Sequence, residues 1–227
     1  MNFVDLVEKL RIECGVSGSP VLSVQNLSGE LLRLKNWIAD AWDELQAAHQ
    51  DWKFLHQTFS FSTTANKRQY TYIDAGIASF DIWDQSSFWI YNVSFGVSDQ
   101  QPIGQMPWHN FREMYIRGVQ TPMRPMCYSV APDKSLWFGP LPDIPYNITG
   151  EYWVLPSAMV NDTDTPAGLP LRFHRCIVYG AMKKYAGYEG AAEVMARAQS
   201  EGTPLWNNLE LDQLPIITIA GGGFNVA

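Results

Sequence analysis

Two amphipathic helical patterns open the chain, one after Asn2 and a longer one after Ser28. In both patterns apolar residues recur every three or four positions, which places them on one helix face. Asn2 and Ser28 are residue types that cap helix N-termini, and Gly15 is expected to end the first helix. The apolar positions are Phe3, Leu6, Val7 and Leu10, then Leu31, Leu34, Trp37, Ile38, Ala41, Trp42, Leu45 and Ala48. These one-sided stripes need a cover, so the two helices are expected to pack on each other or on a later helix.

Between about Phe54 and Val160 the apolar period changes from 3.6 to 2, which predicts antiparallel strands. Residues 87–97 are expected to form a central strand, because both of their alternating faces carry apolar side chains. Pro107 marks the start of a short helix within this region. Further strands are expected at residues 126–130, 136–138 and 148–155.

The helical period returns at Leu171, after a polar link at residues 161–170, and continues to Tyr188. Gly187 and Gly190 are expected to break this helix. A further helical segment is expected at residues 191–200. A last short helix is expected to start at Thr203 and Pro204, a capping residue followed by the residue favoured at the first helical position, and to end at Leu209.

Helices therefore flank the strands, and the predicted fold class is α+β. We expect a helical bundle built from both chain ends, an inserted antiparallel β-sandwich-like region and an extended C-terminal tail. The predicted domains are residues 1–54 plus 161–212 for the discontinuous helical bundle, 55–160 for the β domain and 213–227 for the docking tail.

The tail carries no charged side chain after Asp212, and residues 216–219 have high β propensity. An uncharged segment that favours strands is an aggregation hazard unless it is paired. Three states are open: the tail folds back on its own sheet, docks on another chain, or is disordered. The residues expected to make a contact are Leu214, Ile216, Ile217, Ile219 and Phe224.

Composition adds constraints on partners and compartment. Sixteen Lys and Arg against 23 Asp and Glu give a net charge of −7, which argues against tight nucleic-acid binding through phosphates. Charged residues make up only 17% of the chain, so we expect partner chains to cover part of the surface. Asp5 and Glu8 stand where a secretory leader would carry Lys or Arg, and no apolar run is long enough for a membrane helix, so synthesis in the cytoplasm is expected. The three cysteines, Cys14, Cys127 and Cys176, lie far apart and are expected to be reduced and mostly buried.

No motif predicts catalysis, a metal or a cofactor. The histidines lack the spacing that brings two imidazoles to one metal, and they are interpreted as caps or core residues: His49, His56, His109 and His174. Asp162 and Asp164 alternate with Thr before a proline and fit turn chemistry better than an acid pair. One helix carries four basic residues that could face DNA phosphates, although a solvated face is the preferred interpretation: Arg172, Arg175, Lys183 and Lys184.

Thirty aromatic residues, many of them in the strands, leave two interpretations open. Core packing is the default for alternating positions, whereas exposed aromatic platforms could bind sugars. Five tryptophans are too many to hide in one modest sandwich, so some are expected to meet neighbouring subunits: Trp83, Trp89, Trp108, Trp137 and Trp153.

Four segments, taken in order, carry a family resemblance. They are ECGVSGS after the first helix, LLRLKNWIADAWDELQAAHQDWKFL at 31–55, EYWVLPSAM at the end of the strand region and DTPAGLPLRFHRCIVYGAMKKYAGYEG at 164–190, with TPLWNNLEL following. Together they resemble the head-to-tail adaptor (connector) proteins of tailed bacteriophages, the group that includes tail tubular protein A of short-tailed phages.

This resemblance implies a structural virion protein and not an enzyme. It implies a ring of about twelve identical subunits in the virion neck, between the portal and the tail or nozzle, with genome DNA passing through the centre. The C-terminal tail would contact the portal, and the helix after Leu171 would lie near the channel. The alternative is a virion-associated carbohydrate-binding or cell-wall-degrading accessory protein.

Overall fold

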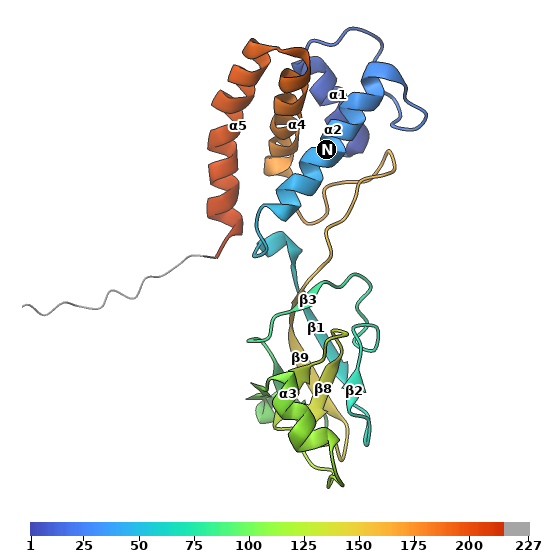
Figure 1. The fold of residues 1–227 in the computed structure, drawn as a ribbon, viewed down its shortest axis with the longest axis vertical. Helices are drawn as coiled ribbons and strands as arrows, with labels where there is room; N and C mark the ends of the chain where they lie inside the picture. Colours follow the sequence, from blue (N-terminus) through green and yellow to red (C-terminus); the bar gives the residue numbers. More distant parts are fainter. Residues whose placement is uncertain (216–227) are drawn as a thin grey trace, which may run out of the picture. The chain divides into compact units, whose positions relative to one another are not determined.

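The computed structural model describes residues 1–215, which form two compact units: residues 1–55 with 156–215, and residues 56–155 (Figure 1). Within these residues the fold is α+β, as predicted, with five α-helices and two β-sheets. Four of the helices belong to the first unit, and both sheets belong to the second. In the described part of the chain, no helix combines the length and the apolar character that crossing a membrane requires.

The helical unit is organised around one central helix. Its helices are α1 (Phe3–Glu13), α2 (Gly29–Ala47), α4 (His174–Glu189) and α5 (Ala192–Gln213), with short 3₁₀ turns η1 (Lys53–Leu55) and η4 (Leu171–Phe173). Helix α4 packs against α1, α2 and α5, and α1 also packs against α2 (Figure 1). The apolar stripes of α1 and α2 are therefore covered by α4 and by each other, as their spacing predicts.

Local signals set one end of α1 and one end of α4. The Asn2 side chain accepts a hydrogen bond from the Asp5 backbone N–H at 2.8 Å, and the Asp5 carboxylate accepts one from the Asn2 N–H at 3.0 Å. This reciprocal pair satisfies two free donors of the first turn of α1. Ser28 precedes α2 in an extended conformation, but its side chain makes no capping hydrogen bond. Gly190 ends α4 in the left-handed conformation, with φ of 67°, which glycine adopts without strain.

Helix α5 runs without a break from Ala192 to Gln213, with Pro204 in its interior. The predicted separate segments at 191–200 and from Thr203 are therefore wrong, and Gly187 lies inside α4. The physical reason is tertiary packing: Ala198 and Leu209, on either side of Pro204, are fully buried. Burial on both sides of the proline holds one continuous helix despite the missing N–H donor.

The second unit contains two sheets. The first has the order β1 (His56–Ser62), β9 (Tyr146–Trp153), β4 (Trp89–Asn92) and β5 (Gln101–Pro102), and β3 (Ile82–Trp83) also pairs with β9. The second has the order β2 (Gln69–Tyr70), β8 (Leu136–Gly139), β7 (Cys127–Val130) and β6 (Gly104–Gln105). All described pairs are antiparallel except β6–β7, which is parallel. The expectation of a wholly antiparallel region therefore holds for every pair but one.

Side chains from both sheets form one hydrophobic cluster. Phe59, Phe61 and Ile148 contribute from the first sheet, and Tyr128 and Phe138 contribute from the second. The aromatic rings of this cluster lie close together: the Phe61 and Phe138 centroids are 6.3 Å apart, and the Phe88 and Tyr128 rings stack with centroids 4.2 Å apart. Aromatic burial of this kind dominates the stability of small β structures.

The predicted strand at residues 87–97 is only four residues long, because β4 ends at Asn92. A turn and a 3₁₀ helix, η2 (Gly96–Asp99), follow it and lead into β5, which pairs back with β4. The short helix expected after Pro107 is present as α3 (Trp108–Phe111), and a π-helical turn, η3 (Arg112–Ile116), continues it.

Candidate functional site

The four basic residues singled out in the sequence lie on η4 and α4, and three of them pair with acids of the helical unit. Arg172 pairs with Asp212 of α5. The Arg175 guanidinium lies 3.6 Å from the Glu13 carboxylate. These contacts neutralise the positive charges that a DNA phosphate would need.

The remaining two lysines of this set lie beside a groove. Lys184 Nζ is 2.6 Å from the Glu44 carboxylate of α2. Lys183 is exposed and has no ion-pair partner among residues 1–215. Both lysines border a groove of about 540 Å³ between α2, α4 and α5, whose floor includes Ala41 and Gly180. Helix α4 therefore presents little uncompensated positive charge.

An exposed apolar turn follows β4 in the second unit. Val93, Phe95 and Val97 are 51%, 69% and 68% exposed, so all three side chains contact solvent in the isolated chain. Their sequence alternation predicted burial in a central strand, and that prediction is wrong because the strand ends before them. Large apolar side chains gathered on a surface are typical of sites that bind other proteins.

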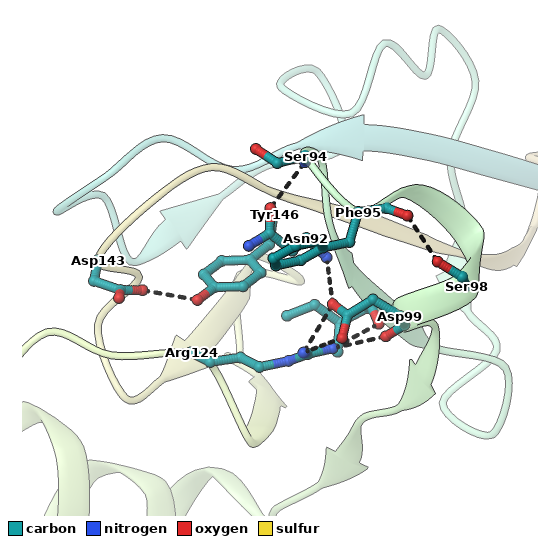
Figure 2. A network of polar contacts seen from close by, with 9 residues as sticks. Asn92, Ser94, Phe95, Ser98, Asp99, Arg124, Asp143 and Tyr146 are labelled. Atoms are coloured by element: carbon teal, nitrogen blue, oxygen red, sulfur yellow. Dashed lines mark hydrogen bonds and ion pairs between the residues drawn. The ribbon is translucent and has the colours of Figure 1, made fainter.

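A network of hydrogen bonds holds this turn in place (Figure 2). Arg124 Nη1 donates to both carboxylate oxygens of Asp99, at 2.9 and 2.8 Å, and Nη2 donates to the Asp99 carbonyl at 3.0 Å. The Asn92 backbone N–H donates to Asp99 Oδ2 at 2.8 Å, and the Ser94 N–H donates to Asn92 Oδ1 at 2.8 Å. Its hydrogen bonds with Arg124 lower the pKa of Asp99, which favours the charged carboxylate. The turn is therefore preorganised before any partner binds.

Three further contacts extend this network (Figure 2). The Ser98 hydroxyl donates to the Phe95 carbonyl at 2.8 Å, which fixes the backbone that carries the exposed ring. The Arg124 guanidinium lies over the Tyr146 ring, 5.7 Å from its centroid, and the Tyr146 hydroxyl donates to the Asp143 carboxylate at 2.9 Å. The network thus connects the turn to strand β9.

A second segment of the same unit also exposes apolar side chains. Met114, Val119, Met123 and Met126 are all exposed, and Arg124 lies between the last two. Because Arg124 binds Asp99, this segment is attached to the turn at residues 93–97. Methionine side chains adapt to irregular partners, which suits a contact surface. We call the two segments, residues 93–97 and 114–126, the apolar surface of the β unit.

The tryptophans are mostly enclosed. Trp83 is buried, whereas Trp108, Trp137 and Trp153 are half-buried. Trp89 is 42% exposed, and it alone of the nine tryptophans, all of which lie in the described residues, belongs to the exposed class. These side chains therefore do not form an exposed row of the kind a sugar platform uses.

The acidic pair at Asp162 and Asp164 has the predicted turn geometry. The Asp164 carboxylate accepts the backbone N–H groups of Val160 and Asn161, each at 2.7 Å. These backbone hydrogen bonds lower the pKa of Asp164. Asp162 Oδ1 accepts the Val24 N–H at 2.7 Å, so both carboxylates organise loops of the helical unit.

The cysteines are reduced and buried, as predicted. Burial raises the pKa of the Cys14 and Cys176 thiols to about 12, and it also raises the pKa of Cys127. Reactive cysteines have lowered pKa values, so these three are packing residues.

His174 has the core role predicted for it, whereas His49 is partly exposed and His109 is exposed. His174 is buried and lies 3.1 Å from the Leu169 carbonyl, and burial lowers its pKa. His49 lies 2.9 Å from the Glu210 carboxylate. His109 is exposed on α3.

His56 is the exception, because it lies beside two carboxylates. Its Nε2 atom is 3.2 Å from Glu151 Oε2 and 3.8 Å from Asp84 Oδ2. Within residues 1–215 these three residues form the one group of His, Cys, Asp and Glu side chains close enough to share an ion. Sequence reasoning missed the group because its members come from three separate elements of one sheet.

The predicted contact residues of the tail lie largely beyond the described residues. Leu214 is half-buried at the end of α5, and its N–H donates to the Glu210 carbonyl at 2.9 Å. Ile216, Ile217, Ile219 and Phe224 lie outside residues 1–215.

Exposed apolar side chains on a hydrogen-bonded support are typical of proteins that contact other proteins. A family model described as SU10 adaptor protein matches residues 1–208. The chain therefore belongs to this family of bacteriophage adaptor proteins, and the resemblance found in its sequence is confirmed. No curated protein matches the chain.

Proposed function

We propose that this protein is a structural, non-catalytic component of the virion neck, where a ring of about twelve copies joins the portal to the tail or nozzle and surrounds the path of the genome. Its membership of the SU10 adaptor protein family, over residues 1–208, is the observation that carries this proposal. The protein is made in the host cytoplasm and assembles onto the portal from there.

The apolar surface of the β unit supports the lateral contact between subunits. Phe95 and Val97 are exposed on a turn that Arg124 and Asp99 hold rigid, so little conformational entropy is lost when a partner covers them. A ring contact of this kind joins two different faces of each subunit, and low charge on both faces favours burial.

The charge distribution supports a channel that DNA passes without being held. The chain has a net charge of −7, and Arg172, Arg175 and Lys184 are paired with acids of their own unit. Each Lys or Arg that neutralised a phosphate would add binding free energy that DNA transit must then overcome. We place α4 near the channel on this ground, with its charges compensated internally.

The C-terminal tail is proposed as the portal contact. Helix α5 ends at Gln213, and the twelve residues after Pro215 carry no charged side chain. In this proposal an apolar face of the portal ring binds the tail and buries its β-prone residues. The tail residues that make this contact are Leu214, Ile216, Ile217, Ile219 and Phe224.

The carbohydrate-binding or wall-degrading alternative gains no specific support from the described residues. A sugar platform needs several accessible aromatic faces, and of the nine tryptophans only Trp89 is in the exposed class.

The test mixes the purified protein with its portal and images the product by negative-stain electron microscopy. Rings seated on portals are expected for the native chain. The double variant Phe95→Asp/Val97→Asp is expected to abolish ring formation while it leaves the thermal unfolding midpoint unchanged, because both side chains are exposed in the monomer. Leu22→Asp is the matched control, since Leu22 is 86% exposed in a loop of the helical unit.

Two outcomes would refute parts of this proposal. A protein that never attaches to portals but binds cell-wall glycans would favour the accessory-protein alternative. Normal rings from the Phe95→Asp/Val97→Asp variant would remove the apolar surface from the lateral contact. A chain cut after Pro215 tests the tail separately: it is expected to keep the native unfolding midpoint and to lose portal binding.

A further inference from the structure

We propose that His56, Asp84 and Glu151 form a binding site for a divalent transition-metal ion of the zinc type. One donor atom from each residue lies within 4.8 Å of the other two. The His56 Nε2 atom lies 3.2 Å from Glu151 Oε2 and 3.8 Å from Asp84 Oδ2. Ligand atoms around a tetrahedral Zn²⁺ lie about 3.3 Å apart, given metal–ligand distances of about 2.0 to 2.1 Å. Small side-chain adjustments would therefore bring all three donors onto one ion.

The sheet fixes the positions of all three residues. His56 begins β1 opposite Trp153 of β9, and Glu151 lies two residues before Trp153 on that strand. Asp84 directly follows β3, which pairs with β9 on its other edge, and its N–H donates to the Glu151 carbonyl at 3.0 Å. Three hydrogen-bonded segments therefore carry the three donors, which is the rigid support that a metal site requires.

The His56 ring is oriented, and its nitrogen is unused. The ring stacks on the Trp153 indole with centroids 4.6 Å apart and planes at 23°. The Nε2 atom is buried and makes no hydrogen bond within residues 1–215, because the nearby Glu151 oxygen is not aligned to accept one. A buried ring nitrogen without a partner is unfavourable, and a metal ion would satisfy it.

Hydrogen bonds also orient the Asp84 carboxylate and attach its loop to β9. Asp84 Oδ1 accepts the backbone N–H of Ser86 at 2.9 Å and its hydroxyl at 2.7 Å, so Oδ2 is the oxygen that faces His56. The Ser87 hydroxyl donates to the Asp84 carbonyl at 2.8 Å and accepts the Glu151 N–H at 2.8 Å, which connects the loop to β9. Hydrogen bonds that orient ligands from outside are typical of protein metal sites.

The charge of the cluster favours a divalent cation. Among the described residues, no Lys or Arg lies within 4.0 Å of the Asp84 or Glu151 carboxylate. A metal ion binds the neutral form of imidazole, and with the ring in that form the two carboxylates give the cluster a charge of about −2, which one divalent ion balances. One nitrogen and two oxygen donors suit Zn²⁺, Mn²⁺ or Co²⁺ better than Mg²⁺, which binds imidazole poorly. All three side chains are partly exposed, so an ion can enter from solvent.

The consequence of binding is structural. The ion would connect β1 and β9, the first and last strands of the β unit, with the segment that follows β3. Ligand binding to the folded state raises its stability in proportion to the logarithm of the free metal concentration. Because the measurement uses the isolated chain, its result is independent of portal binding.

The test uses the full-length chain without an affinity tag, freed of metal by chelator and kept reduced. Titration calorimetry with Zn²⁺ is expected to show one equivalent bound, and Co²⁺ is expected to give visible absorption bands of a low-coordinate site. Single variants His56→Gln, Asp84→Asn and Glu151→Gln are each expected to weaken Zn²⁺ binding at least about tenfold. His109→Gln and Glu113→Gln are matched controls on exposed positions of α3 and η3, and they are expected to bind as the native chain does.

Circular dichroism of each variant separates loss of the site from loss of the fold, and the two conservative carboxylate variants keep the test usable if His56→Gln unfolds. The proposal is overturned if the native chain binds no Zn²⁺ at 100-fold molar excess. It is also overturned if all three site variants bind one equivalent with native affinity, because the ion would then lie elsewhere, for example on the cysteines. Equal affinities for Zn²⁺ and Mg²⁺ would also overturn the proposal, because binding would then come from the two carboxylates alone and not from His56.

Discussion

At Gly202, helix α5 comes so close to α4 that there is no room for a side chain. A Cβ atom at this position would lie 2.8 Å from the Cβ of Tyr179, closer than real Cβ contacts. Gly187 of α4 is the opposite case, because nothing lies within 4 Å of its Cβ position. Both residues are inside helices, so the same substitution to alanine has opposite expected effects at the two positions.

We expect Gly202→Ala to lower the free energy of unfolding by about 1 to 3 kcal/mol, because α4 and α5 must move apart. Gly187→Ala should raise it by about 0.5 to 1 kcal/mol through helix propensity alone. Urea denaturation of both variants checks the pair. Equal stabilisation by both substitutions would show that α5 and α4 leave room for a methyl group at Gly202, contrary to the 2.8 Å between its Cβ position and the Tyr179 Cβ.

A second residue-scale prediction concerns Asp74 and acid stability. Its carboxylate lies 2.6 Å from Lys67 Nζ and accepts the Thr71 N–H at 2.7 Å and the Thr71 hydroxyl at 2.8 Å. These hydrogen bonds, the one from Lys67 foremost, lower the pKa of Asp74 to about 2. A carboxyl group in the unfolded chain has a pKa of about 3.9. The folded carboxylate therefore adds stability above pH 4, and this contribution is lost as the pH falls towards 2.

Asp74→Asn should remove this contribution. We expect a loss of about 1 kcal/mol or less at pH 7, because Lys67 and Asp74 are both partly exposed. Below pH 3 the variant and the native chain should converge in stability. Thermal unfolding at pH 7, 4 and 2.5 measures this, with Asp51→Asn as the control, an exposed residue that has no ion pair among residues 1–215. A constant difference at all three pH values would mean that ionisation of Asp74 is not the cause.

At the scale of elements, the position of Pro204 in the C-terminal helix can be tested: it lies either inside one long helix or at the start of a short one. The sequence predicts a helix start at Thr203 and Pro204, whereas the structure has one helix from Ala192 to Gln213. A proline at a helix start costs nothing, but a proline in a helix interior removes a hydrogen bond to the residue four positions earlier, here Ser200.

Pro204→Ala should therefore stabilise the protein by about 1 kcal/mol or more, because the restored N–H can donate to the Ser200 carbonyl and Pro204 itself is exposed. Chemical denaturation measures the change. Destabilisation by this substitution would favour a helix that begins at Pro204. Pro132→Ala serves as a control, since this exposed proline lies in a turn between β7 and β8 where no helix is present.

Which elements the sequence could predict depends on whether their signals are local. Helix α1 was predicted from Asn2 as its cap and from the spacing of its apolar residues, and both signals lie within the first ten residues. The strands at Cys127–Val130 and Leu136–Gly139 lie within one residue of the ranges predicted for them. By contrast, the end of β4 at Asn92 depends on Asp99 and on Arg124, which lies 25 positions further along the chain. Alternation at Phe95 continues past that point and gives no sign that the strand has ended.

The candidate sites were harder to predict for the same reason. The turn at residues 93–97 has the composition of a buried strand, yet its apolar side chains are exposed. The contact between Arg124 and Asp99 that holds the turn joins residues far apart in the sequence, so periodicity does not reveal it. The cluster of His56, Asp84 and Glu151 forms only when β1 and β3 pair with β9. Periodicity identifies the faces of elements but not which elements become neighbours.

At the scale of the whole molecule, the β unit is continuous in sequence and its two ends meet. His56 of β1 lies opposite Trp153 of β9, so the first and last strands of residues 56–155 are partners in one sheet. The unit also has its own aromatic cluster, drawn from both sheets. A segment with its own core and adjacent ends has what independent folding requires.

We expect residues 56–155, expressed alone, to fold cooperatively with a near-ultraviolet circular dichroism spectrum of packed aromatic rings. A matched substitution makes this quantitative: Phe88 is buried and stacks on Tyr128, so Phe88→Ala should cost about 3 to 5 kcal/mol. If the unit folds independently, this cost is the same in the excised unit and in the β-unit transition of the full chain, because the rings that pack on Phe88 (Phe59, Trp83 and Tyr128) lie inside the unit. A much smaller cost in the excised unit, or a spectrum without aromatic signals, would mean that the β unit needs the helices to fold.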